Sequence, residues 1–261
     1  MASAVEGGGA FRDRARAESF GAIAEQYDRA RPQYPAALFD ELATTAGGTD
    51  VLDVGCGTGK AAVLLAARGL HVLGVEIDPA MAEVARARGV EVEVSSFEGW
   101  DDRGRTFDLI TSAQAWHWVN PEAGARTAFR VLRPGGAVAL FWNVHAIPVE
   151  LRERFDAVYE RHAPALAGRM NGHASRGSRS VERAEPGLVA AGFTDVAHRR
   201  FDWQQLYTRD EWLDLLATFS DHQLLPEPAR GNLLAARGDA VDELGGSMNV
   251  EYSTLLLLAR R

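Results

Sequence analysis

The sequence has a single cysteine, Cys56, so no disulfide can form within the chain, and this favours a reducing compartment such as the cytoplasm. Long apolar runs are missing too: the runs present, such as residues 255–259, fall far short of the roughly 20 residues of a membrane-spanning helix. The polar, Gly-rich start lacks the charged-then-apolar order of a signal peptide. The His, Cys and acidic residues show no metal-ligand spacing. We therefore expect a cytoplasmic protein without a membrane segment or a bound metal.

Basic residues are outnumbered by acidic ones, 28 Lys and Arg against 36 Asp and Glu, which gives a formal net charge of −8. This charge opposes a general attraction to nucleic acid phosphates, so we expect no nucleic acid partner. The 261 residues, 46% of them hydrophobic, are enough for a globular domain with a sizeable core. Neither composition nor charge predicts an oligomeric state.

Two helices are predicted near the start of the chain. Residues 1–16 are small and weakly patterned, and we expect them to be mobile. In residues 17–45 apolar side chains recur at helical spacing around Phe20, Ile23 and Tyr27, and prolines within residues 31–35 interrupt the pattern. We interpret this segment as a helical cap.

Residues 46–145 alternate between buried strands and amphipathic helices, which predicts a parallel, doubly wound sheet, because a helix must cross over between parallel strands. Asp78, followed by Pro79, is a predicted helix N-cap. Two more strands are predicted near the carboxyl end. We therefore expect an α/β, Rossmann-like, mostly parallel sheet of seven strands, at residues 50–54, 71–77, 90–95, 107–112, 137–142, 193–203 and 252–259, with a turn at 133–136.

Two further segments, 146–185 and 205–245, are predicted to form a helical cap or lid within the single domain 17–261. Helical patterns cover residues 148–162, 209–219 and 226–244. Residues 168–180 are rich in Gly, Ser, Arg and His and offer little apolar area to bury. We expect a mobile lid or a disordered loop there.

The motif with the clearest chemistry is VLDVGCGTG at residues 51–59, a buried strand that runs into a glycine-rich loop and then a helix. Glycine permits positive φ and lets a ligand approach the main chain, and the helix start presents free N–H groups. Glu76 ends the next strand, where a carboxylate can accept hydrogen bonds from both hydroxyls of a ribose. Together these features favour a binding site for a small ribose-containing ligand. The alternatives are an ordinary βα turn for the loop and a solvated strand-end charge for Glu76.

The glycine spacing separates this loop from phosphate-binding motifs. A dinucleotide fingerprint reads G-x-G-x-x-G, whereas here the third glycine comes one residue early and Lys60 follows it. A Walker loop needs G-x-x-x-x-G-K-[ST], and here Ala61 follows Lys60. Phosphate ligands therefore fit this loop poorly.

At these residues the chain resembles the class I S-adenosylmethionine-dependent methyltransferases, whose first motif has the form VLDVGCGTG and whose second strand ends in an acid like Glu76. It is also similar, over about residues 18–261, to the small-molecule subgroup around trans-aconitate methyltransferase. The segments that carry this similarity are FGAIAEQYDRARPQYP, SSFEGW, SAQAWHWVNPE, RVLRPGGAVALFWN, ATFSDHQLLP and EYSTLLLLARR. The resemblance implies a methyltransferase with S-adenosylmethionine as its cofactor.

The resemblance also implies which residues bind the cofactor. Asp53 anchors the loop and the methionine end, Glu76 holds the ribose, and Ile77 packs on the adenine. Gly99 stands where the family usually has a charged residue, so no adenine contact is expected from that position. The implied cofactor residues are Asp53, Gly55, Cys56, Gly57, Gly59, Glu76, Ile77, Phe97, Glu98, Ser112, Ala113 and Gln114.

Two histidines are candidate catalytic bases. His117 follows the fourth strand and His145 the fifth, where α/β sheets place their ligands, and imidazole titrates near neutrality. His117 and Trp118 are also candidates for binding the substrate. Structural roles stay open, because His117 can shape the pocket between its two tryptophans and His145 can cap its loop.

The N-terminal cap supplies the other candidates. In this fold class such a cap covers the cofactor, so the hydroxyls of Tyr27 and Tyr34 are candidate substrate contacts, with core packing as the alternative. Arg31 is a candidate for binding an acidic substrate through its forked donors. The alternative for Arg31 is a solvated side chain.

We therefore expect methyl transfer from S-adenosylmethionine to a small-molecule acceptor, an organic acid or a secondary metabolite. Such a transfer needs alignment and exclusion of water, and a base only where the nucleophile is protonated. The alternative is an S-adenosylmethionine-binding protein with a regulatory or non-methylating role. Methylation of nucleic acid is disfavoured by the net charge of −8 and by the lack of an Asn/Asp-Pro-Pro-Tyr motif.

Overall fold

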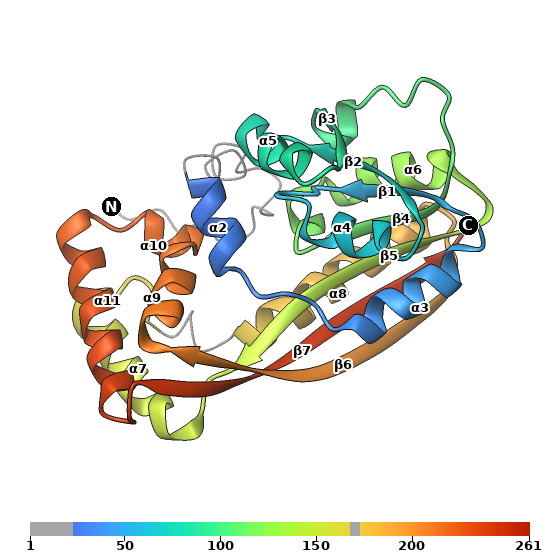
Figure 1. Cartoon of the computed structure of the whole chain (residues 1–261). Helices are drawn as coiled ribbons and strands as arrows, with labels where there is room; N and C mark the ends of the chain where they lie inside the picture. The colour runs from blue at the N-terminus through green and yellow to red at the C-terminus, as the bar shows by residue number, and fades with distance from the viewer. Residues whose placement is uncertain (1–22, 168–172) are drawn as a thin grey trace, which may run out of the picture.

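The computed structural model describes residues 23–167 and 173–261. Within these ranges the chain forms a seven-stranded sheet in the order β3-β2-β1-β4-β5-β7-β6 (Figure 1). Strands β1 to β5 are parallel, and β7 runs antiparallel between β5 and β6. The predicted Rossmann-like, mostly parallel sheet is therefore confirmed. Its strands are β1 Asp50–Val54, β2 His71–Glu76, β3 Glu91–Val94, β4 Phe107–Ala113, β5 Leu132–Ala146, β6 Thr194–Thr208 and β7 Ser247–Arg260.

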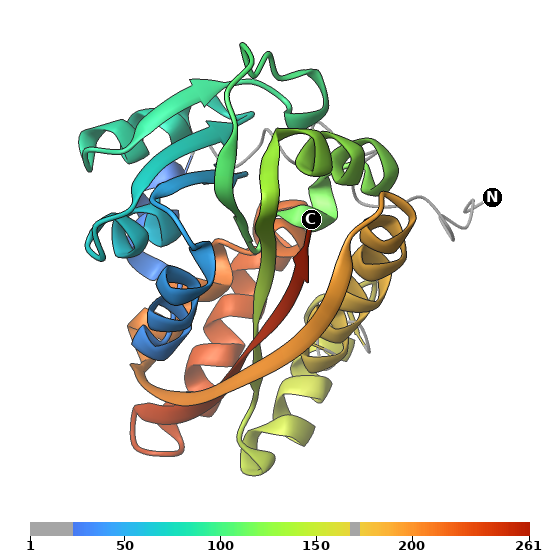
Figure 2. The same cartoon turned by 90° about the vertical axis from the view of Figure 1, so that its right-hand side faces the viewer.

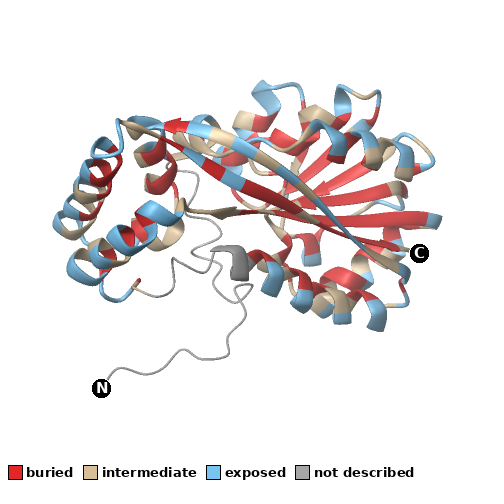
Figure 3. Cartoon of the chain, turned by 90° about the horizontal axis from the view of Figure 1, so that it is seen from below, coloured by how far each residue is buried: buried red, intermediate tan, exposed pale blue. Residues whose placement is uncertain are grey.

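Helices cover both faces of the sheet, which explains why its central strands are apolar on both sides (Figures 2 and 3). On one face α3 (Ala36–Ala46), α4 (Lys60–Ala66) and α5 (Pro79–Ala87) bury their apolar side chains. On the other face α6 (Pro121–Val131) and α8 (His173–Ala190) pack against alternate residues of the same strands. The core is therefore a three-layer α/β/α sandwich.

Side-chain caps fix the starts of two of these helices. The Asp78 carboxylate accepts hydrogen bonds from the backbone N–H groups of Ala80 and Met81, at 2.9 and 3.3 Å, as the Asp78 N-cap prediction requires. The Asn120 side chain accepts from Ala123 N–H at 2.9 Å and starts α6 in the same way. Among the described residues, no helix is long and apolar enough to cross a membrane.

The two predicted helices of the N-terminal cap are present where the structure describes them. Helix α2 (Ala24–Ala30) ends at Arg31, an extended segment follows, and α3 begins at Ala36. The predicted mobile segment 1–16 and the start of the cap, residues 17–22, lie outside the described residues.

Strands β5, β7 and β6 extend beyond the parallel core and carry a second group of helices, which we call the helical lobe (Figure 1). Its core packs Phe155, Trp212 and Val241 against Tyr207 of β6 and Tyr252 of β7. Helix α2 contacts α9 of the lobe and α5 of the core, so it joins the two parts. The lobe consists of α7 (Val149–His162), α9 (Arg209–Ala217), α10 (Ser220–Gln223) and α11 (Glu227–Asp242).

The prediction of a mobile lid or disordered loop at 168–180 is wrong for residues 173–180, which form the first turns of α8. Residues 168–172 lie outside the described residues. Gly177 of the predicted loop serves close packing instead, because a Cβ there would overlap Val144 of β5. Further along α8, a Cβ on Gly187 would lie 2.9 Å from the Pro121 carbonyl oxygen. Helix α8 can approach the sheet and α6 only because these side chains are absent.

Three strands, β5, β6 and β7, are several residues longer than predicted. The turn predicted at residues 133–136 lies inside β5, where the pairing with β4 jumps from Phe107↔Leu132 to Leu109↔Ala137. The extra residues form an irregularity in the strand pairing rather than a boundary of β5. Strands β6 and β7 run beyond the predicted 193–203 and 252–259, because they pair with each other out to Thr208 and Ser247.

Candidate functional site

The glycine-rich loop joins the carboxyl end of β1 to α4. Gly55, Gly57 and Gly59 have φ of +66°, +55° and +79°, a region that favours glycine. A Cβ on Gly55 would lie 2.5 Å from the Ala115 Cβ after β4, so this position also requires the missing side chain. The loop therefore turns tightly at the carboxyl edge of the sheet, where α/β folds bind their ligands.

Glu76, at the end of β2, is buried and holds this loop through its carboxylate. One oxygen, Oε2, accepts a hydrogen bond from the Gly57 N–H at 2.7 Å. The other, Oε1, accepts from the N–H groups of Ile77 and Asp78 at 2.9 and 3.0 Å. Burial raises the pKa of Glu76, and these three bonds lower it. Since each carboxylate oxygen can accept two hydrogen bonds, Oε2 can still accept one from a ligand hydroxyl.

Asp53 of β1 is completely buried beside this loop. Its Oδ1 accepts a hydrogen bond from the Thr111 hydroxyl at 2.8 Å, but its Oδ2 has no partner among the residues that the structure describes. Burial, together with the field of Glu76, raises the pKa of Asp53 to about 7, against the bond from Thr111. A buried carboxylate oxygen without a partner is costly, and a ligand cation would satisfy it.

The edge after β4 is fixed mainly by hydrogen bonds within the chain. The Ser112 hydroxyl donates to the Val54 carbonyl at 2.8 Å, so it ties β4 to β1. Gln114 has a φ of +56°, and its backbone N–H donates to the Phe141 carbonyl at 2.9 Å. Its side-chain amide donates to the Asn143 carbonyl at 3.0 Å. Ala113 is half-buried between these two residues.

The short helix η3 (Phe97–Gly99) follows β3 on the same edge. Phe97 is buried against Trp100 and Trp116, with ring centroids 6.4 and 6.0 Å away. Glu98 is exposed, and its carboxylate accepts a hydrogen bond from the Asn120 N–H at 2.6 Å. The partly exposed Ile77 lies at the start of the neighbouring loop. Phe97 and Glu98 thus join this edge to the start of α6.

His117 lies in the short helix η4 (Trp116–Trp118), beside the ring of Trp118 at 4.8 Å between centroids. The indole N–H of Trp142 faces its Nδ1 at 3.4 Å. An indole can only donate, so Nδ1 accepts, and a neutral His117 carries its proton on Nε2. In this tautomer Nε2 is a hydrogen-bond donor rather than a proton acceptor.

Asp28 of α2 is a site residue that the sequence did not indicate. Its carboxylate accepts hydrogen bonds from the Thr58 hydroxyl and from Arg88, both at 2.7 Å, and Lys60 Nζ lies 3.9 Å away. Asp28 therefore attaches α2 to the glycine-rich loop. No local pattern points to this contact, because Asp28 and Thr58 are 30 residues apart.

Tyr27 and Arg31 are in contact near the end of α2, and Tyr34 lies in the extended segment that follows. The Arg31 guanidinium lies 4.8 Å from the Tyr27 ring centroid and 4.7 Å from that of Phe219, and it donates to the Thr218 carbonyl at 2.8 Å. Burial, followed by the fields of Tyr27 and Asp53, raises the pKa of Tyr34, so its hydroxyl stays protonated. The Tyr34 ring packs against Phe39 and Phe141, with centroids 6.1 and 5.2 Å away, which is the core packing that was its alternative role.

His145, near the end of β5, faces the helical lobe. Its ring lies 5.9 Å from Trp212, 6.4 Å from Phe219 and 5.5 Å from Tyr252, between centroids. Burial, with the positive fields of Arg237 and Arg31, lowers the pKa of His145 to about 3. The imidazole is therefore neutral at physiological pH, and it is a weak base.

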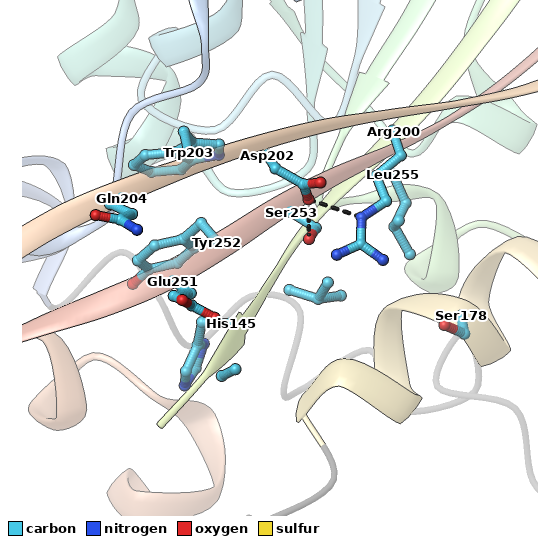
Figure 4. Close-up of a pocket in the computed structure, with 12 residues that line it drawn as sticks. His145, Ser178, Arg200, Asp202, Trp203, Gln204, Glu251, Tyr252, Ser253 and Leu255 are labelled. Carbon is cyan, nitrogen blue, oxygen red and sulfur yellow. Dashed lines mark hydrogen bonds and ion pairs between the residues drawn. The ribbon is translucent and has the colours of Figure 1, made fainter. Parts of the chain in front are cut away.

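A cavity of about 610 Å³ lies along the extended strands and reaches His145 and Tyr252 (Figure 4). Its polar wall is internally paired, because Asp202 accepts hydrogen bonds from Arg200 at 2.7 Å and from the Ser253 hydroxyl at 2.5 Å. Within the described ranges, no group of three or more His, Cys, Asp and Glu side chains could hold a metal ion.

Comparisons with known proteins agree with this geometry. The chain matches the family model of the methyltransferase domain over residues 51–136, which include the glycine-rich loop and Glu76. An uncharacterized methyltransferase of Mycobacterium tuberculosis is 35% identical over 210 residues, which cover 77% of this chain and 76% of that protein. Another uncharacterized methyltransferase, of Schizosaccharomyces pombe, is 24% identical over 232 residues, which cover 86% of this chain and 88% of that protein.

Solved structures share the fold. A structure from Anaeromyxobacter dehalogenans, classed as a type II methyltransferase, superposes with a TM-score of 0.60 at 24% identity, over 88% of this chain and 97% of its own. Phosphoethanolamine N-methyltransferase 2 of Haemonchus contortus, in complex with phosphomonomethylethanolamine and S-adenosylhomocysteine, superposes with a TM-score of 0.54 at 17% identity, over 96% of this chain and 59% of its own. The family model and the mycobacterial relative go further than fold: the chain belongs to the class I S-adenosylmethionine-dependent methyltransferases.

Proposed function

We propose that this methyltransferase acts on a small-molecule acceptor, an organic acid or a secondary metabolite. The observation that carries the cofactor site of this proposal is the buried Asp53 oxygen that has no partner among the described residues, beside a loop whose glycines turn with positive φ. A ligand with an ammonium group and a ribose fits both features. The similarity of the chain to the trans-aconitate methyltransferase subgroup supports an acid as the acceptor.

In this proposal the cofactor lies along the carboxyl edge of β1, β2 and β4. Asp53 binds the ammonium group at the methionine end, and Glu76 accepts a hydrogen bond from the ribose. Ile77 packs on the adenine, with Phe97 and Glu98 at its edge. The loop residues Gly55, Cys56, Gly57 and Gly59 and the strand-end residues Ser112, Ala113 and Gln114 line the homocysteine part.

The bound cofactor supplies an activated methyl group on a sulfonium. The residues of the chain then have to align the acceptor atom and exclude water. Tyr27, Arg31 and Tyr34 close one side of the site in this proposal, and His117 with Trp118 closes the other. His117 acts as a positioning donor, because its Nδ1 is occupied by the Trp142 N–H.

His145 contributes polarity rather than base catalysis. With a pKa of about 3 it gains little from accepting a proton in the transition state, since an efficient general base has a pKa near the working pH. A carboxylate acceptor would need no base, because its oxygen is already deprotonated at neutral pH.

Calorimetry and a turnover assay test the proposal. We expect the chain to bind S-adenosylmethionine and S-adenosylhomocysteine and to bind NAD much more weakly. A screen of organic acids and aromatic metabolites with detection of S-adenosylhomocysteine then identifies the acceptor. Binding without turnover on any acceptor would favour a regulatory role, and NAD binding without binding of either methionine-derived ligand would overturn the proposed site.

A further inference from the structure

Two guanidinium groups at the helical lobe have no carboxylate partner among the residues that the structure describes. Arg31 donates only to the Thr218 carbonyl, and its Nε has no partner among the described residues. Arg237 of α11 is 3% exposed, yet its Nε also has no partner in the described part of the chain. A buried guanidinium whose Nε–H lacks an acceptor is unfavourable, so the site requires an explanation.

Aromatic rings surround the Arg237 guanidinium. Its Cζ lies 3.3 Å from the ring centroid of Phe155, 5.0 Å from that of Tyr159 and 5.7 Å from that of Trp212. Ring faces attract a cation but offer no acceptor in the plane of its N–H groups. Burial lowers the pKa of Arg237 to about 10 against the field of Asp156, so the group stays charged at neutral pH. Asp156 and Arg237 form no ion pair, and the Asp156 Oδ1 has no partner within the described residues either.

Arg31 and Arg237 each contact an aromatic ring that also contacts His145. Trp212 lies between His145 and Arg237, with centroid distances of 5.9 and 5.7 Å, and Phe219 links His145 to Arg31 at 6.4 and 4.7 Å. Both guanidinium groups are close enough to lower the pKa of His145. His145 also lines the cavity of about 610 Å³, so a small molecule in this cavity can reach the imidazole (Figure 4).

We propose that Arg31 and Arg237 form an oxyanion-binding site beside His145 that holds a carboxylate or phosphate group of the acceptor. The assignment of this anion to the acceptor rests on the proposed function. A guanidinium presents its N–H groups in a planar fork that matches both anions, and the oxyanion would supply the acceptor that the Nε–H of each arginine lacks. The neutral imidazole adds a hydrogen-bonding group without further positive charge, and the aromatic walls suit an acceptor with an unsaturated or aromatic body.

The test is a titration of the full chain, saturated with S-adenosylhomocysteine, with phenylacetate, phenyl phosphate and the neutral phenylacetamide. We expect at least one of the two anions to bind at least tenfold more tightly than the amide. The anion that binds more tightly shows whether the site prefers a carboxylate or a phosphate group. Arg237→Met and Arg31→Met should each weaken anion binding ~10- to 100-fold, the range for losing hydrogen bonds to a charged group. Arg161→Gln, on the exposed face of α7, is the matched control and should leave the affinity unchanged.

Thermal unfolding separates this role from a structural one. Without ligand, Arg237→Met should unfold at the same temperature as the wild type or higher, because an uncompensated buried charge is removed at similar volume. If Arg237→Met melts earlier and binds the anions normally, Arg237 is a structural residue and the proposal is wrong. If Arg237→Met does not fold, Arg237→Lys replaces it: the lysine keeps the charge and loses the fork, so anion affinity should fall while affinity for S-adenosylhomocysteine stays.

Two results distinguish this inference from the proposed function. Equal affinity for the anions and the amide, in a chain that binds S-adenosylhomocysteine normally, would overturn the oxyanion site alone. Failure to bind S-adenosylhomocysteine would overturn the proposed cofactor site. The oxyanion site would then be tested on the unliganded chain, by whether anions bind it and whether Arg237→Met weakens that binding.

Discussion

The Asp28 carboxylate of α2 accepts a hydrogen bond from the Thr58 hydroxyl of the glycine-rich loop at 2.7 Å. The same oxygen accepts one from Arg88 at the end of α5, also at 2.7 Å. One side chain therefore joins the N-terminal cap, the loop and the end of the next βα unit, β2–α5. The geometry of the loop consequently depends on a residue outside the glycine motif.

Replacing Asp28 with Ala should weaken binding of S-adenosylhomocysteine about 3- to 10-fold, the effect of losing roughly one hydrogen bond that holds the loop. Calorimetry on folded protein measures this. Asp40→Ala is the matched control. Asp40 lies on α3 and forms an ion pair with Arg68 rather than with the loop. Equal affinities for the wild type and both variants would show that α2 does not shape the cofactor loop.

Replacing Glu76 with Ala should weaken cofactor binding by about 1.5 to 3 kcal/mol, the range for a lost charge-assisted hydrogen bond. The structure adds a second effect, because Glu76 also accepts from Gly57, Ile77 and Asp78. The melting temperature should therefore fall as well. Glu76→Gln keeps one acceptor oxygen and should lose less on both measurements, and an unchanged dissociation constant in folded Glu76→Ala would place the ribose elsewhere.

Affinity for S-adenosylmethionine should depend on pH through Asp53, whose pKa is raised to about 7 by burial. A cationic ligand binds the ionised carboxylate, so affinity is full above pH 7 and falls by up to about tenfold per pH unit below it. Binding at pH 7 should also release part of a proton, which calorimetry in buffers of different ionisation enthalpy detects. Asp53→Asn should remove this pH dependence, and a wild-type affinity that is constant from pH 5.5 to 8 would contradict the role of Asp53.

Stability should fall in mild acid because of His222, which is completely buried in the helical lobe. Its Nδ1–H donates to the Leu216 carbonyl at 2.7 Å and its Nε2 accepts from the Tyr159 hydroxyl at 2.9 Å, the arrangement of a neutral ring. Burial lowers its pKa from 6.5 to about 4. Below pH 6.5 the unfolded chain takes up a proton that the folded chain refuses until about pH 4, so the free energy of unfolding drops by about 1.4 kcal/mol per pH unit in this window.

Urea unfolding between pH 7 and 4 measures this loss of stability. His145, whose pKa is also lowered, decreases the free energy of unfolding in acid as well. His222→Gln should reduce the slope of unfolding free energy against pH, whatever its effect on overall stability. His71→Gln, at a side chain that is 80% exposed, should leave the slope as it is. Identical slopes for the wild type and His222→Gln would show that His222 is not held neutral.

His117→Asn should keep most of the single-turnover rate and mainly raise the Michaelis constant, because an amide can replace the imidazole as a donor to the acceptor. His117→Ala should lose more. A general base would behave differently: both variants would lose 10²- to 10⁴-fold in rate, and the wild-type rate would rise through a pKa near 6 to 7. That pattern would contradict the tautomer set by the Trp142 N–H.

The sequence by itself determined the parallel core, the glycine-rich loop and Glu76. Each depends on residues close in the chain. A buried strand, a loop and a helix follow one another within residues 50–66, and the next strand ends at Glu76. Local patterns encode such units, because their hydrogen bonds and burial are decided by residues in the same βα unit. The Asp78 N-cap was predictable for the same reason.

Tertiary structure alone decided the contacts of α2 and of the helical lobe. Asp28 reaches Thr58 across 30 residues, and Arg31 reaches Thr218 across 187, so no local pattern contains either pair. The glycines of α8 resembled a loop in sequence, and only the nearby sheet and α6 show that they allow a helix to pack closely. Arg237 carries no sequence signal among the 27 arginines of the chain, and its burial without an ion pair arises only when α7, α9 and α11 fold around it.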